Sequence, residues 1–108
     1  MSCIFCGIAK KEIPAKIVHE TASFIAFDDI APQAPVHVVV IPKAHLRSIE
    51  ELKDNGDVFS VITSIAREKG VDQKGFRIVV NKGSEAGQTV EHIHFHLLGG
   101  RKFKWPPG

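Results

Sequence analysis

The chain has 108 residues, enough for one domain with a modest core. Its net charge of +2, without a basic cluster, argues against nucleic acid as a partner. The longest strongly apolar run, Val38–Ile41, is too short to cross a membrane, and two cysteines without a signal-peptide pattern indicate a cytoplasmic protein with no membrane partner.

In chain order, the sequence predicts an α+β fold: an antiparallel sheet of about five strands, one long helix and a short N-terminal helix. The expected helices are a short turn over 4–9, a helix start with a capping box between Ser48 and Glu51, and the long helix over 57–69, with Gly70 as its C′ residue. The expected strands are 17–20, 23–27, 36–41, 76–80 and 90–98. Because 36–41 is nearly all apolar, it should be a central strand buried on both faces, with His37 as the exception.

Three of the six histidines alternate with apolar residues in the run His92-Ile93-His94-Phe95-His96. If this run is a strand, the imidazoles share one face and the apolar side chains the other. Neighbouring imidazoles would stand about 6.6 Å apart and the outer pair about 13 Å apart, so three from one straight strand reach a single metal ion poorly. A phosphate-sized group suits the row better, with one histidine as nucleophile and a neighbour as proton donor.

The loop before this run combines glycines with small polar side chains. Asn81, Ser84, Gln88 and Thr89 could hydrogen-bond phosphate oxygens, although a solvated turn has the same composition. Earlier in the chain, Asp28-Asp29 could accept hydrogen bonds from sugar hydroxyls or simply form a turn. The apolar residues Phe5, Ile8, Phe27 and Ile30 could line a slot for a base or belong to the core.

Cys3 and Cys6 have the spacing of the first half of a tetrahedral zinc site. His45, just after a strand end, and His92 are the candidates to complete it, whereas His19 is expected to be a surface residue. A redox pair and two reduced core thiols are the alternatives.

At this point the chain resembles the histidine-triad (HIT) superfamily over nearly its whole length, as a single domain over 1–108. The run His92–Leu98 matches the family signature. The supporting segments are 11–15, Asp29-Ile30 with Pro32–Pro35 and His37, Val80-Asn81, and Gly87–Val90. The ending, Gly99–Arg101 and Trp105–Gly108, looks like the Hint branch of purine nucleoside phosphoramidases rather than the Fhit branch, which cleaves dinucleoside polyphosphates.

The resemblance implies an enzyme that releases AMP from an AMP phosphoramidate. His94 would attack the α-phosphorus to form a nucleotidyl-histidine, with its other ring nitrogen held by the carbonyl of His92. His96, with His37 beside it, would hydrogen-bond the phosphate and help the amine leave. The substrate contacts implied are Asn81, Gln88 and Thr89 for phosphate, Asp29 for ribose, and Ile4, Phe5, Ile8, Phe27 and Ile30 for the purine.

The resemblance also implies a homodimer in which the tail, including Trp105, reaches the partner's site. Two departures matter: Thr89 stands where the family usually has serine, and the Cys3/Cys6 pair occurs in prokaryotic relatives but not in the well-known animal Hint proteins. By analogy with related transferases, Cys3, Cys6, His45 and His92 would hold a structural zinc, and catalysis itself would need no cofactor. The alternatives are dinucleoside polyphosphate hydrolysis, a nucleotide-binding regulatory module, and a metal-binding protein that uses the triad as ligands.

Overall fold

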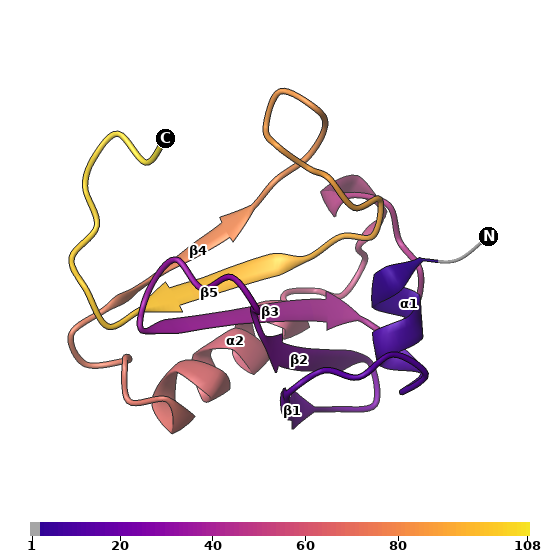
Figure 1. The fold of residues 1–108 in the computed structure, drawn as a ribbon, viewed down its shortest axis with the longest axis horizontal. Helices are drawn as coiled ribbons and strands as arrows, with labels where there is room; N and C mark the ends of the chain where they lie inside the picture. The colour runs from indigo at the N-terminus through magenta and orange to yellow at the C-terminus, as the bar shows by residue number, and fades with distance from the viewer. Residues whose placement is uncertain (1–2) are drawn as a thin grey trace.

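The structure is a computed structural model that describes residues 3–108, and it contains a five-stranded antiparallel sheet in the order β1-β2-β3-β5-β4 (Figure 1). The strands are β1 (Ile17–Glu20), β2 (Phe24–Asp28), β3 (Val36–Pro42), β4 (Phe76–Val80) and β5 (Phe95–Gly99). The helices are α1 (Ile4–Ala9), the 3₁₀ turn η1 (Ile49–Glu51) and α2 (Asp57–Glu68). The expected α+β class is confirmed. No helix of the described residues is long and apolar enough to span a membrane.

The central strand β3 separates two apolar clusters. Val38 and Val40 pack with Ile62 and Ile65 of α2, whereas Val39 and its neighbours on the other face pack beneath α1. Side chains alternate across a strand, so an apolar strand of this length must be covered on both sides. The expectation of a doubly buried central strand is therefore confirmed, and His37 shares the α1 face with Val39.

The long helix α2 ends as its sequence predicts. Gly70 adopts a φ of +73°, its N–H donates to the carbonyl of Arg67 at 3.1 Å, and Val71 N–H donates to the carbonyl of Ala66 at 3.0 Å. These two bonds form a Schellman motif, in which a left-handed C′ residue favours glycine. At the other end, the carboxylate of Asp54 accepts the N–H of Val58 at 2.8 Å, so α2 is capped by an upstream side chain.

Two of the predictions from the sequence are wrong, the start of the histidine strand and the capping box at Ser48. The histidine strand begins at Phe95 rather than Val90, because its pairings with β3 and β4 both stop at Phe95 and the N–H of Ile93 donates to the carbonyl of Leu46 instead. The capping box at Ser48 is also absent. Its hydroxyl donates to Glu50, while Glu51 accepts the N–H of Arg47, and only the short turn η1 forms there.

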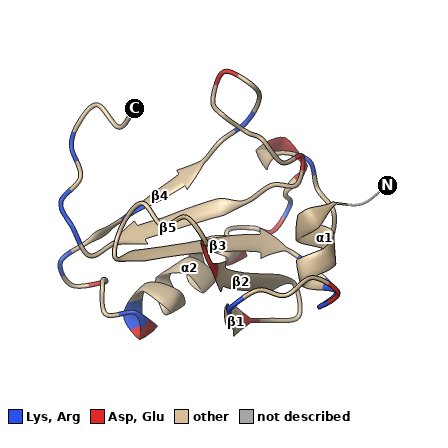
Figure 2. Ribbon diagram, viewed as in Figure 1, with Lys and Arg blue, Asp and Glu red and all other residues tan. Residues whose placement is uncertain are grey.

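Charged residues lie mainly in the loops, at the C-terminal end of α2 and along the C-terminal tail (Figure 2). The helix α1 has no charged residue and covers one end of the sheet face opposite α2 (Figures 1 and 2). The sheet face that carries His37 and Val39 is thus covered at one end by an apolar helix.

Candidate active site and metal cluster

A cleft of about 470 Å³ opens between α1, the end of β2 and the segment that leads into β5. Part of its lining is apolar and part consists of imidazole and carboxylate groups. It includes all of the expected purine-contacting residues together with Asp29, Thr89, His94 and His96. Sequence reasoning missed five further lining residues, namely Ile13, Pro14, Ala15, Val39 and Val90. Each lay near a signal, since Ile13, Pro14, Ala15 and Val90 belong to the segments 11–15 and 87–90 that carry the resemblance. Val39 lies two residues after His37 on the same strand face.

One ring nitrogen of His94 is hydrogen-bonded, and the other has no hydrogen-bond partner among residues 3–108. Its Nδ1 lies 2.8 Å from the backbone carbonyl oxygen of His92, and the side chain is only 8% exposed. A carbonyl oxygen only accepts, so Nδ1 must carry the proton and Nε2 must carry a lone pair. The backbone therefore selects the tautomer in which Nε2 is the nucleophilic nitrogen.

A chain of hydrogen bonds selects the opposite arrangement for His96. The N–H of Gln33 donates to His37 Nδ1 at 3.0 Å, so the proton of neutral His37 lies on Nε2. That nitrogen is 2.9 Å from His96 Nδ1 and 3.4 Å from Asp29 Oδ2. Because His96 Nδ1 accepts, its remaining proton lies on Nε2. His96 is thus a hydrogen-bond donor toward the cleft that it lines.

The surroundings favour the neutral forms of His37 and His96 at pH 7. Burial lowers the pKa of His96 to about 4, with smaller contributions from the nearby His94 and His37 and an opposing one from Asp29. Burial also lowers the pKa of His37, again opposed by the carboxylate of Asp29. An arriving phosphate would favour the protonated forms, since an opposite charge stabilises a cation.

The second set of candidate residues comes together from three parts of the chain. The Sγ atoms of Cys3 and Cys6 and ring nitrogens of His45 and His92 lie within 4.8 Å of one another. Nδ1 of His92 is 3.4 Å from Cys3 Sγ and 3.6 Å from Cys6 Sγ, while Nδ1 of His45 is 3.1 Å from Cys6 Sγ. Tetrahedral zinc with bonds of about 2.0–2.3 Å requires S···N separations of about 3.5 Å. The Cys/His cluster therefore suits zinc.

The hydrogen bond of the other ring nitrogen of His92 also suits zinc binding by this cluster. Nε2 lies 2.9 Å from the carbonyl oxygen of Pro42, to which it must donate, so Nδ1 faces the two cysteines with its lone pair.

A second group of possible metal ligands consists of Asp29, His37 and His96, whose ligand atoms are comparably close to one another. It fits a metal poorly, because the Gln33 N–H places the His37 proton on the very nitrogen that would have to bind the ion.

The HIT domain family model matches residues 10–103. The chain belongs to the HIT domain family. A HIT family hydrolase from Legionella pneumophila superimposes with a TM-score of 0.93 at 44% identity, covering 99% of this chain and 100% of that one. A histidine triad nucleotide-binding protein from Candida albicans gives 0.86 at 35% identity, covering 99% and 85%. A 14 kDa zinc-binding protein from Zea mays is 44% identical over 97% of this chain and 87% of its own length.

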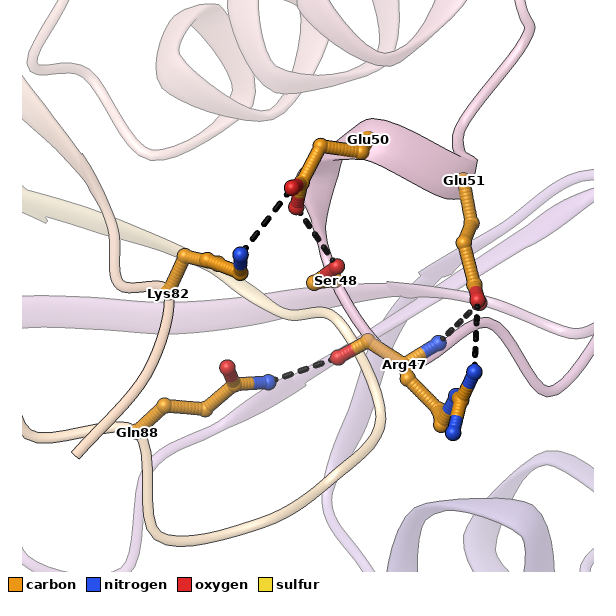
Figure 3. Close-up of polar contacts among 6 residues, drawn as sticks. All are labelled: Arg47, Ser48, Glu50, Glu51, Lys82 and Gln88. Atoms are coloured by element: carbon orange, nitrogen blue, oxygen red, sulfur yellow. Dashed lines mark hydrogen bonds and ion pairs between the residues drawn. The ribbon is translucent and has the colours of Figure 1, made fainter.

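Other expected contacts of this HIT protein lie outside the cleft lining. Gln88 braces the loop: its Nε2 donates to the carbonyls of Arg47 at 2.7 Å and Val90 at 3.1 Å, and its Oε1 accepts the N–H of Gly83 at 3.0 Å. Figure 3 shows the first of these bonds, next to the ion pair between Lys82 and Glu50. Together these contacts fasten the loop after β4 to the segment around η1. Asn81 directly follows β4, and Trp105 in the tail is 83% exposed.

A larger hollow of about 680 Å³ lies near the C-terminal end of β5, between Gly70 and Arg101. Its lining has lysine and arginine side chains but no histidine, cysteine or carboxylate. The groups needed for nucleophilic and proton-transfer chemistry are therefore in the smaller cleft.

Proposed function

We propose that this HIT protein is a nucleotide-binding hydrolase that cleaves the P–N bond of AMP phosphoramidates. The observation that carries the proposal is the opposite protonation of two neighbouring imidazoles: His94 has a free Nε2 lone pair, and His96 has an Nε2 proton. Their ring centroids are 5.2 Å apart. A nucleophile and a proton donor at this spacing suit displacement at a phosphorus atom.

In the first step, Nε2 of His94 attacks the α-phosphorus while the P–N bond to the leaving amine breaks. The negative charge of the bound phosphate first favours the cationic, doubly protonated ring of His96, which the carboxylate of Asp29 also stabilises. This ring donates its Nε2 proton to the departing nitrogen and becomes neutral. In the second step, water attacks the same phosphorus, the bond to His94 breaks, and the water's proton returns to His96. AMP leaves, His96 releases its extra proton to solvent, and both imidazoles regain their starting neutral tautomers.

The apolar wall of the cleft supports a purine as the base, and Asp29, whose side chain is 22% exposed, supports ribose hydroxyls as donors to its carboxylate. Thr89 borders the cleft and retains the hydroxyl of the serine usual in the family, which supports a phosphate contact. The proposed roles of Asn81 and Gln88 differ: Asn81 would contact phosphate directly, whereas Gln88 would contact it only after a change in its present bonds.

We also propose that Cys3, Cys6, His45 and His92 hold a structural zinc. The S···N separations, the free lone pair of His92 Nδ1 and the similarity to the maize zinc-binding protein support it. When bound, the zinc would cross-link the N-terminal segment to the chain before β5. Elemental analysis and native mass spectrometry of protein expressed with zinc should give one ion per chain, and no zinc in either would contradict this.

We further propose that the protein is a homodimer located in the cytoplasm. Reduced thiols in the Cys/His cluster suit a cytoplasmic location. Phe59 on α2 is 51% exposed and Trp105 in the tail is 83% exposed, and a second copy would cover such apolar side chains. Light scattering coupled to gel filtration should give twice the mass of the chain.

The decisive experiment compares the wild type with His94→Ala on a fluorogenic adenosine phosphoramidate and on diadenosine triphosphate. We expect fast AMP release from the phosphoramidate, a slow reaction with the triphosphate, and loss of both in the variant. A faster triphosphate reaction would favour dinucleoside polyphosphate hydrolysis. AMP binding without turnover of either substrate would favour a regulatory module.

A further inference from the structure

We propose that the Cys/His cluster positions two walls of the nucleotide cleft, so that metal binding and nucleotide binding strengthen each other. This inference rests on the proposed zinc and the proposed nucleotide. It assigns Cys3, Cys6 and His45 a positioning role in nucleotide recognition that neither proposal contains.

The first wall is α1, where metal-binding and cleft-lining side chains alternate along one short helix. Cys3 is its N-cap and Cys6 lies within it, while Ile4, Phe5 and Ile8 line the cleft. The helix has only six residues, and isolated helices shorter than about 12 residues are marginal in water. Its position must therefore come from contacts with the rest of the protein.

On the sheet side those contacts are apolar. Within α1, Phe5, Ile8 and Ala9 pack on the small apolar cluster of that sheet face. A polar connection is the approach of Cys3 and Cys6 to His45 and His92, residues more than 35 positions later in the chain. A metal ion would turn this approach into bonds and hold the apolar wall against the cleft.

The second wall is the segment that carries His94, the proposed nucleophile. His92 is fully buried, and its ring is held between the Pro42 carbonyl on one side and the two cysteines on the other. Its backbone carbonyl is the acceptor that fixes the tautomer of His94. Anything that anchors the His92 ring through Nδ1 therefore also steadies the group that orients His94.

Phe5 connects the two walls. It stands between the two cysteines in sequence, and its ring lies edge-on to both His92, at 5.9 Å between centroids, and His94, at 5.0 Å. A shift of α1 would move this ring away from the nucleophile and open the base-binding side of the cleft. The same displacement would therefore weaken nucleotide contacts and loosen the metal ligands.

Coupling between two binding sites is reciprocal in free energy. We expect AMP to bind at least tenfold more weakly to the metal-free protein than to the zinc-loaded protein. By the same linkage, saturating AMP should raise the zinc affinity by the same factor. A purely stabilising metal would leave AMP affinity unchanged at a temperature where both forms are folded.

The test uses calorimetric titration of AMP into zinc-loaded and chelator-treated full-length protein, with circular dichroism to verify folding. Zinc affinity is measured with a chromophoric chelator, with and without AMP. Nitrogen NMR of the His94 ring provides an independent signature: the Nδ1–H tautomer should dominate with zinc and mix with the Nε2–H tautomer without it. Cys6→Ser should reproduce the metal-free result, and Glu12→Gln, an exposed change just after α1, should behave as wild type.

Three results would overturn the inference: AMP affinities within twofold with and without zinc, a zinc affinity that AMP does not change, or a protein that binds no zinc. If the metal-free form or the serine variant unfolds, the effect of AMP on zinc release from the loaded wild type still decides. Failure of the proposed function looks different, because AMP would then not bind the zinc-loaded protein either.

Discussion

Replacing His96 with asparagine should flatten the dependence of stability on pH. In the fold, burial lowers the pKa of His96 to about 4, and both His37 and His94 oppose its protonation. In the unfolded chain the pKa returns to about 6.5. Between these values the unfolded state binds a proton that the folded state does not, so the free energy of unfolding falls as the pH falls from 6.5 towards 4. Well above pH 6.5 the ring is neutral in both the folded and the unfolded state, so the free energy of unfolding does not suffer this loss.

The size of the effect follows from the two pKa values. Moving from pH 7.5 to 5.0 would cost about 2 kcal/mol for one isolated group with this shift. Because the ring borders an open cleft, solvent screening should reduce this to about 1 kcal/mol. For a chain of this length, about 1 kcal/mol corresponds to a change in Tm of about 4 °C.

The comparison needs a variant that keeps the neighbouring hydrogen bond. Asparagine does so, since its Oδ1 can accept from His37 Nε2, the atom 2.9 Å from His96 Nδ1. Thermal unfolding of both proteins is followed at pH 7.5 and 5.0 with excess zinc. Acid also weakens the Cys/His cluster, but both proteins carry it, so that loss cancels in the difference. We expect the wild type to lose about 4 °C more than the variant, and equal losses would refute the reasoning.

Three further predictions concern packing, the loop and the tail. Gly99→Ala should destabilise the protein by about 1–3 kcal/mol in urea unfolding, since a Cβ there would lie 2.8 Å from the Val71 side chain; an unchanged midpoint would contradict this. Gln88→Ala should lower kcat/KM about tenfold with an unchanged far-UV spectrum, because two backbone groups of the loop and the carbonyl of Arg47 lose their partner. Trp105→Ala should change the free energy of unfolding by less than about 0.5 kcal/mol, because the side chain is exposed. It should weaken AMP binding several-fold if the tail contacts the nucleotide site of a partner subunit. An unchanged AMP affinity in calorimetry would contradict that contact.

Local patterns predicted most of the secondary structure. The apolar run of β3, the helical stripe of α2 and Gly70 at its end depend on interactions within a few residues, and all appear where expected. The predicted start of β5 is wrong, because the alternation of histidines and apolar residues continues back to His92 while the pairing with β3 and β4 stops at Phe95. A strand exists only where a neighbour supplies hydrogen bonds, and that neighbour is remote in sequence.

The sequence by itself determined which chemistry was available: three alternating histidines, a cysteine pair and a glycine-bearing loop. Tertiary structure decided the tautomer, the hydrogen-bond partner and hence the chemical role of each histidine. His92 faces cysteines near the other end of the chain, His94 is held by the backbone of its own segment, and His96 pairs with His37 on the neighbouring strand β3. Tautomer and pKa depend on which donors, acceptors and charges surround each ring, and those neighbours come together only when distant segments pack.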